Sequence, residues 1–182
     1  MSADRPAVCV YCASGPVDEQ YLQLAADVGT ALADAGLALV SGGGKISMMG
    51  SVARSTRAAG GRTIGVIPEH LMAKEVADLD ADELIVTDTM RERKRLMEEL
   101  ADGFITLPGG IGTLEEFFET WTGGYLGEHD KPVIMVNLDG FYDPMLAWLR
   151  DLQTRGFVSS HALERLIVVE TAADAVTELT RR

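Results

Sequence analysis

Short runs of residues that are apolar at nearly every position recur along this chain, separated by longer runs with helical periodicity. A strand exposed on one face alternates apolar and polar residues, whereas a continuous apolar run indicates a strand covered on both faces. Strands are therefore predicted at Ala7–Tyr11, Leu37–Val40, Thr63–Ile67, Glu83–Val86, Phe104–Leu107, Val133–Asn137 and Leu166–Val169. Strands of this kind belong to parallel sheets.

The runs between these strands predict the covering helices. They lie at Tyr21–Ala35, Met48–Ala59, Arg91–Leu100, Leu114–Trp121, Pro144–Leu152 and Ala172–Leu179. The alternation predicts an α/β fold, a doubly wound, Rossmann-like parallel sheet with helices on both faces. In such a fold the ligand crevice lies outside the carboxyl ends of the strands. The least regular piece, His70–Ala81, is expected to form a loop over that site.

Size and charge limit the possible partners. With 182 residues, 47% of them hydrophobic, the chain is long enough for one domain over 1–182 with a full core. The net charge of −12 argues against broad binding to nucleic acid or to an anionic membrane. No apolar run approaches the roughly 18 residues of a membrane helix. No apolar stretch follows the first residues as in a signal peptide, so a cytoplasmic protein is expected.

The two cysteines, Cys9 and Cys12, have the C-x-x-C spacing of redox and zinc sites. They fall in the first predicted strand and at its end, where positions three apart point to opposite faces. A zinc site would also need a second pair of ligands. Two reduced thiols and no metal are therefore expected.

A glycine-rich turn follows one predicted strand and leads into a helix, with the sequence Pro108-Gly109-Gly110-Ile111-Gly112-Thr113-Leu114-Glu115-Glu116. Glycines let a ligand approach the backbone closely, and the N–H groups at the start of a helix attract an anion. The segment predicts a phosphate site, with Glu115 and Glu116 as acid/base candidates beside it. A local interpretation also exists, because Thr113 and Glu116 fit a capping box in which Glu116 only caps its own helix.

An earlier glycine loop occupies Ser41–Gly50. It resembles the G-x-G-x-x-G dinucleotide fingerprint, with Ser47 in the third glycine position and as the expected helix cap. No acidic residue closes the next strand, which ends at Ile67-Pro68. A loop that faces a nucleotide and a tight turn without a ligand both remain open.

A cluster of cations lies at the start of another predicted helix. Thr89 and Glu92 form a capping box that places the helix start at Met90. Cations are unfavourable in this first turn because of the helix dipole. The cluster consists of Arg91, Arg93, Lys94 and Arg95. Either they form a solvated face paired with Glu98 and Glu99, or they meet an anionic ligand, which a phosphate site at the same sheet edge favours.

Together these motifs resemble the Lonely Guy family of cytokinin-activating phosphoribohydrolases. Residues 108–116 match its P-G-G-x-G-T-x-x-E motif, and Arg93-Lys94 matches its upstream R-K pair. The resemblance covers essentially the whole chain. Members hydrolyse the N-glycosidic bond of N6-modified adenosine 5′-monophosphates to the free cytokinin base and ribose 5-phosphate. They have often been labelled lysine decarboxylases, a label that nothing in this sequence supports.

The resemblance implies roles for individual residues. Glu116 would orient the ribose hydroxyls and the attacking water, and Arg93 would hold the nucleotide and favour departure of the base. The implied substrate-binding residues are Ser14, Gly43, Gly44, Lys94, Pro108, Gly109, Gly110, Ile111, Gly112 and Thr113. No metal or organic cofactor is implied. The implied partners are the nucleotide 5′-monophosphate and a second copy of the chain in a homodimer.

Other functions remain open at this stage. One is a non-catalytic carrier of a nucleotide or of molybdenum cofactor on the same fold, and another is a hydrolase of plain AMP. Pairing of Arg93 with Glu116 favours the enzyme, because a carrier of an anion gains nothing from a neighbouring carboxylate. The segment Trp121–Gly127 is longer and richer in glycine than in the family, and Ser41 and Ser47-Met48-Met49 also depart from its pattern, so base specificity is left open.

Overall fold

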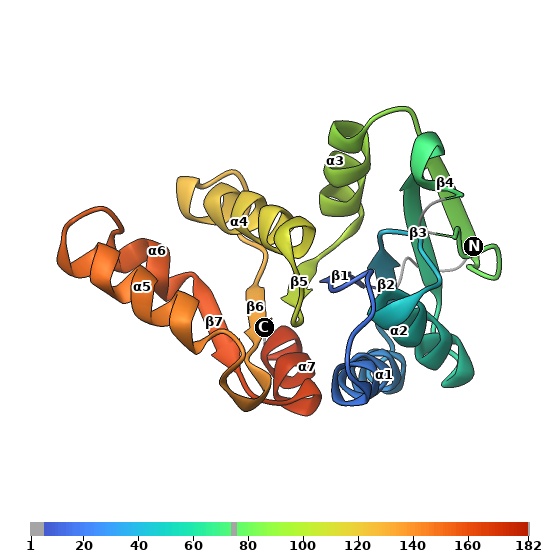
Figure 1. Ribbon diagram of the computed structural model, residues 1–182, viewed down its shortest axis with the longest axis horizontal. Coiled ribbons are helices and arrows are strands. Elements are labelled where there is room, and N and C mark those ends of the chain that lie inside the picture. The colour runs from blue at the N-terminus through green and yellow to red at the C-terminus, as the bar shows by residue number, and fades with distance from the viewer. Residues whose placement is uncertain (1–5, 74–75, 182) are drawn as a thin grey trace.

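A single parallel sheet forms the centre of the computed structural model, which describes residues 6–73 and 76–181 (Figure 1). Every neighbouring pair of strands in it is parallel. The strand order is β4-β3-β2-β1-β5-β6-β7. The strands are β1 (Ala7–Tyr11), β2 (Ala38–Ser41), β3 (Thr63–Pro68), β4 (Glu83–Thr87), β5 (Gly103–Thr106), β6 (Val133–Val136) and β7 (Leu166–Val169). All lie where the apolar runs predict them.

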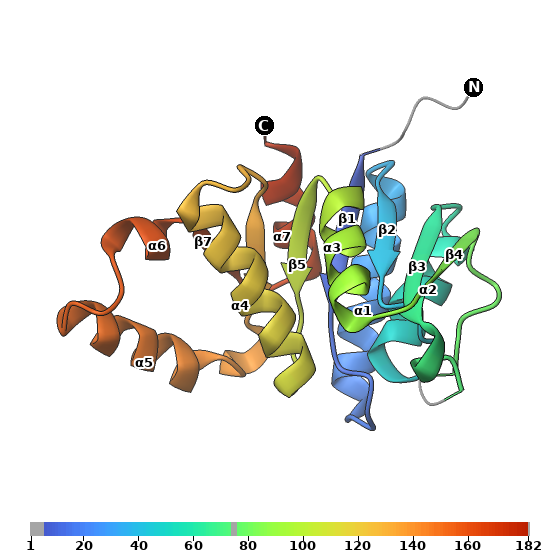
Figure 2. The same cartoon turned by 90° about the horizontal axis from the view of Figure 1, so that it is seen from above.

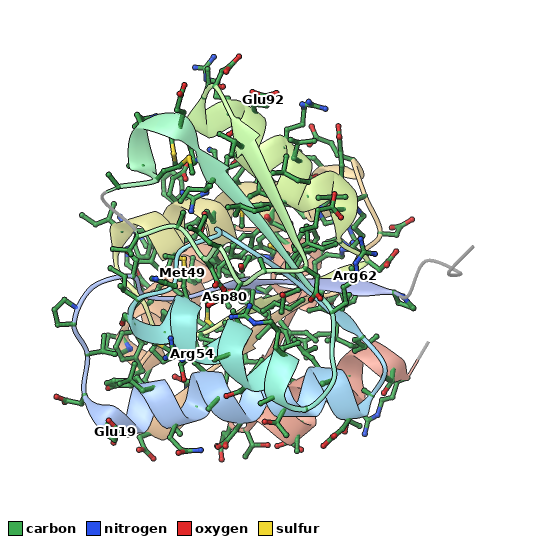
Figure 3. All side chains as sticks on the ribbon, turned by 90° about the vertical axis from the view of Figure 1, so that its right-hand side faces the viewer. Glu19, Met49, Arg54, Arg62, Asp80 and Glu92 are labelled. Atoms are coloured by element: carbon green, nitrogen blue, oxygen red, sulfur yellow. The ribbon has the colours of Figure 1, made fainter. Side chains whose placement is uncertain are left out.

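Helices cover both faces of the sheet. One face carries α1 (Glu19–Asp34), α2 (Ser47–Ala58) and α7 (Ala172–Thr180). The other carries α3 (Met90–Leu100), α4 (Ile111–Leu126), α5 (Asp143–Thr154) and α6 (Ser160–Glu164). Viewed past β4, Glu19 of α1 and Glu92 of α3 lie on opposite sides of the sheet (Figure 3). The predicted doubly wound α/β fold is confirmed.

Two hydrophobic cores result, one on each face. Val8, Val10 and Cys12 belong to the core beneath α1, α2 and α7. Cys9 belongs to the core beneath α3 and α4. Both thiols are buried and neither is in a disulfide, so the prediction that the two cysteines face opposite sides is confirmed.

Three local predictions differ from the structure. Helix α4 begins at Ile111 rather than Leu114 and extends to Leu126. Gly112, which was predicted to belong to the turn, lies in its first helical turn. The five-residue helix α6, capped by Ser159, was not predicted, because it is too short to show a helical period in the sequence. Ser47 is not the cap of α2; it is the first helical residue, has φ 51°, and its hydroxyl donates to the carbonyl of Gly15.

The strand order has a functional consequence. The chain adds β2, β3 and β4 on one side of β1, and then returns to place β5 on the other side. The loops after β1 and β5 therefore leave adjacent strands towards opposite faces and open a crevice between them.

Candidate active site

A cavity of about 460 Å³ lies at this crevice. The loop after β1 contributes one wall, and the glycine turn after β5 with the start of α4 contributes another. The lining residues are Cys12, Ala13, Ser14, Gly15, Pro16, Val17, Tyr21, Met49, Met90, Arg93, Pro108, Gly109, Gly110, Ile111, Gly112, Thr113, Glu115, Glu116 and Phe141. The cavity thus brings together Ser14, Arg93, Glu116 and the whole turn 108–113.

The glycine turn presents a helix N-terminus to the cavity. Gly110 is the N-cap of α4 and has no side chain to satisfy the first N–H groups. A helix offers these groups no internal acceptors, so they favour an anion at this point. Gly109 is required for space, because a Cβ there would lie 2.2 Å from the Thr113 hydroxyl oxygen.

Arg93 reaches the cavity from the first turn of α3 and is only 4% exposed. Its Nε donates to the carbonyl of Val66 at 3.0 Å, and one terminal nitrogen donates to the carbonyl of Gly42 at 2.7 Å. A Cβ at Gly42 would lie 2.2 Å from that nitrogen. The guanidinium is therefore fixed against the ends of β2 and β3, which is the preorganisation that a group binding charge requires.

Glu116 lies in the second turn of α4, and its negative charge affects the pKa of buried groups on and next to β1. Burial is the main cause that raises the pKa of Cys9, Tyr11 and Cys12, and the Glu116 carboxylate raises all three further. Arg93 lowers the pKa of Cys9. Both charged groups thus act on the carboxyl end of β1.

The capping interpretation of Glu116 is wrong. The cap position of α4 belongs to Gly110, and Thr113 is already the third helical residue. The capping box of α3 is confirmed, since the amide of Glu92 donates to the Thr89 hydroxyl at 3.1 Å and α3 begins at Met90. The start of α4 is thus set by Gly110 and not by a capping box of Thr113 and Glu116.

The structure does not place Gly43 and Gly44 on the cavity. The Gly43 carbonyl accepts from the amide of Asp78 at 2.8 Å, and Gly44 bridges to Ala77. The Arg57 side chain holds this loop by an ion pair with Asp78 at 2.9 Å. The backbone of the first glycine loop pairs with residues 76–78, part of the loop predicted over the site. Substrate contact by Gly43 and Gly44 stays a prediction. Residues 74 and 75 of that loop lie outside the described residues.

Lys94 also lies outside the cavity. Its ammonium bonds to Glu115 and to Glu119, the latter at 2.7 Å, in a charged groove between α3 and α4. Burial lowers the pKa of Lys94, but the two carboxylates outweigh it and raise the pKa. Arg95 pairs with Glu99 at 2.7 Å. Arg93 lines the cavity, whereas Lys94 and Arg95 are paired with carboxylates outside it. Substrate contact by Lys94 stays a prediction.

Apolar residues complete the cavity and were not predicted from the motifs. Val17, Tyr21, Met49, Met90 and Phe141 give the cavity apolar walls. Only Phe141, within the Gly140–Pro144 segment, belongs to a motif that the sequence comparison with the family used. The others come from the loop before α1 and from α1, α2 and α3, and they meet only in the folded chain.

The glycines of the segment Trp121–Gly127 do not line the cavity. Gly123 and Gly124 lie in the second half of α4, and Gly127 follows its last residue.

No helix among the described residues has the length and apolar character needed to pass through a membrane.

Solved structures of similar fold support the architecture. A molybdenum cofactor binding protein from Rippkaea orientalis superposes with a TM-score of 0.74 over 98% of this chain and 97% of its own, at 22% identity. The molybdenum cofactor carrier protein of Chlamydomonas reinhardtii gives a TM-score of 0.71 over 97% of each chain, at 21% identity. At such identities the likeness shows the fold alone.

Sequence comparison is more specific. A family model described as "Possible lysine decarboxylase" matches residues 49–179. The cytokinin riboside 5′-monophosphate phosphoribohydrolase of Mycobacterium tuberculosis is 56% identical over 93% of this chain and 90% of its own. The corresponding enzyme of Oryza sativa subsp. japonica, LOG, is 42% identical over 94% of this chain and 72% of its own. With its glycine turn, Arg93 and Glu116 on one cavity, the chain belongs to the Lonely Guy family of phosphoribohydrolases.

Proposed function

We propose that this protein hydrolyses the N-glycosidic bond of N6-modified adenosine 5′-monophosphates, releasing the free base and ribose 5-phosphate. The observation that carries the proposal is the single cavity lined by the glycine turn, Arg93 and Glu116. The matched relatives carry this activity in their names. The proposed catalytic unit is one domain over residues 1–182.

The glycine turn would hold the 5′-phosphate. The N–H groups at the start of α4 face an anion at a helix N-terminus, and the Thr113 hydroxyl lies beside Gly109. Ser14 lines the cavity from the loop after β1. Phosphate binding fixes one end of the nucleotide, so the ribose is held near Glu116.

Glu116 and Arg93 would act on the ribose and the base. Cleavage breaks the bond between C1′ and the base nitrogen, and the electron pair leaves with the base. The sugar then resembles an oxocarbenium ion, which the Glu116 carboxylate stabilises while it orients the attacking water. Arg93 favours departure of the base by offering positive charge. Water adds its oxygen to C1′, and its proton balances the charge on the base.

The proposal also covers the oligomeric state and the cellular location of the protein. We propose a homodimer, supported by exposed apolar side chains on α4, on α5 and on the segment that follows α5. These include Leu126, Trp148 and Phe157, which are 61%, 54% and 75% exposed. Helices α4, α5 and α6 lie towards one end of the molecule (Figure 2). A cytoplasmic location is also proposed, consistent with two free thiols.

The function is tested with N6-isopentenyladenosine 5′-monophosphate, AMP and N6-isopentenyladenosine. Chromatography should show free base and ribose 5-phosphate from the modified monophosphate. Binding of the remote phosphate lowers the barrier as well as aiding binding, so the riboside should lose roughly 10²-fold in kcat/KM. Equal rates on the riboside and its monophosphate would contradict the phosphate site, and absence of any free base would contradict the function.

A further inference from the structure

A buried tyrosine outside the cavity supports the glycine turn from behind. Tyr142 is 3% exposed and follows β6, far in sequence from the turn. Its hydroxyl donates to the carbonyl of Leu107 at 2.7 Å. Leu107 is the residue that joins β5 to the turn, so this bond lies at the root of the proposed phosphate site.

The same hydroxyl also interacts with the turn itself. Burial is the main cause that raises the pKa of Tyr142, and the nearby backbone of Gly109 lowers it. The hydroxyl that holds the Leu107 carbonyl therefore also lies close to the first glycine of the turn.

Two carbonyls at the start of the turn are bound by the rest of the protein. Tyr142 holds that of Leu107, and the Pro108 carbonyl accepts from the amide of Ala13 at 3.3 Å. The N–H groups that begin α4, from Ile111 to Thr113, follow the cap at Gly110 and have no acceptors within the helix. With its first half fixed to the protein, the turn presents its second half to the cavity.

Tyr142 is itself held in place by a short, irregular segment. Asp139 and Gly140 both have positive φ, of 50° and 73°, and they turn the chain back towards β5. The amide of Tyr142 donates to the Asn137 side-chain oxygen at 2.7 Å, and the Asn137 amide group donates to Asp143 at 2.7 Å. Phe141, next to Tyr142, lines the cavity. A single segment thus supplies one cavity wall and the support of the turn.

We propose that Tyr142 is a positioning residue for the 5′-phosphate: its hydroxyl holds the glycine turn in the shape that binds the phosphate. The inference rests on the proposed function. It makes recognition of the phosphate depend on a residue that does not touch the substrate.

The test variant is Tyr142→Phe, which removes the hydroxyl and keeps the ring. Loss of one hydrogen bond corresponds to roughly a tenfold change. We expect kcat/KM for the modified monophosphate to fall about tenfold and the already low value for the riboside to stay within about twofold. Ribose 5-phosphate, titrated by calorimetry, should bind about tenfold more weakly to the variant.

Tyr11→Phe is the matched control. Tyr11 is 4% exposed, and its hydroxyl shares one hydrogen bond of 2.9 Å with Thr120, away from the turn. Circular dichroism checks that both variants fold. If Tyr142→Phe does not fold, Asn137→Ala releases the same segment and should weaken binding of ribose 5-phosphate, a ligand without a base; unchanged binding would overturn the positioning role.

The outcomes separate the inference from the function. Equal losses on monophosphate and riboside, or unchanged binding of ribose 5-phosphate, would overturn the positioning role and leave the function intact. A parent protein that binds ribose 5-phosphate but cleaves no nucleotide would contradict the function, and the binding comparison would still decide the role of Tyr142. If the parent bound no ribose 5-phosphate, the positioning role would also be overturned.

Discussion

The two proposed catalytic residues, Arg93 and Glu116, differ in what holds them. Arg93 is almost fully buried and bonds to two backbone carbonyls, so it is part of the framework as well as of the cavity. Glu116 is half-buried, and its local capping role is excluded by the position of Gly110. Substitutions at the two positions should therefore have different effects on stability.

Glu116→Gln should fold and melt like the parent and still bind the monophosphate, because the amide keeps the size of the side chain. It lacks the negative charge next to the developing oxocarbenium ion, and loss of one preorganised electrostatic group costs about 10²–10³ in rate. Steady-state kinetics and thermal melting measure both effects. Glu115→Gln is the control, since that carboxylate is exposed and pairs with Lys94; near-parental turnover of Glu116→Gln would contradict the catalytic role.

Arg93→Ala should lose both activity and stability. A cation at a helix N-terminus is unfavourable, and this effect alone would leave the melting temperature unchanged or raise it. The structure predicts the opposite, because the variant leaves the carbonyls of Gly42 and Val66 buried without their donor. Each such group costs about 1–3 kcal/mol. Denaturant titration measures the change, and unaltered stability would show that the two bonds contribute nothing.

At the level of elements, α3 and α4 are tied together on the side away from the sheet. Lys94 of α3 bonds to Glu115 and Glu119 of α4. Lys94 and Glu115 are the sequence neighbours of Arg93 and Glu116. This link therefore helps to set the spacing of the two helices that carry the proposed catalytic groups. The motif residue next to Arg93 thus has a structural task of its own.

Lys94→Met should destabilise the fold by less than about 1 kcal/mol, since both carboxylates are half exposed. The pKa of Lys94 is raised from its ordinary value of 10.5. The stabilisation is therefore complete below that value and is lost as the pH rises through the folded-state pKa. Stability of parent and variant should converge in strongly alkaline solution. The exposed pair of Arg95 with Glu99 supplies the control Arg95→Met, whose difference from the parent should show no such convergence.

Elements with a strong local pattern were predictable, and those decided by distant contacts were not. The strands follow from continuous apolar runs, and the start of α3 follows from its capping box. The early start of α4 was missed because Gly110 and Gly112 favour a turn in isolation, although the first helical turn begins between them. Ser47 resembles a helix cap in the sequence, but its hydroxyl donates to the carbonyl of Gly15 on another loop.

At the level of the whole molecule, the position of the cavity was predictable, because parallel α/β sheets bind at the carboxyl ends of their strands. The residues that line the cavity were less predictable than its position. The position of Gly43 and Gly44 outside the cavity lining depends on pairing with residues 76–78. The contact of Tyr142 with Leu107 depends on two positive-φ residues after β6. These contacts join segments that no local motif connects.

The central place of β1 also makes the site depend on both halves of the sheet. Strand β5 pairs with β1 on one side, and β2, β3 and β4 lie on the other. The cavity needs residues 12–17 and 108–116 together. These segments are far apart in the chain, and pairings between distant segments form slowly. A substrate anion can therefore stabilise only a chain in which β5 has paired with β1.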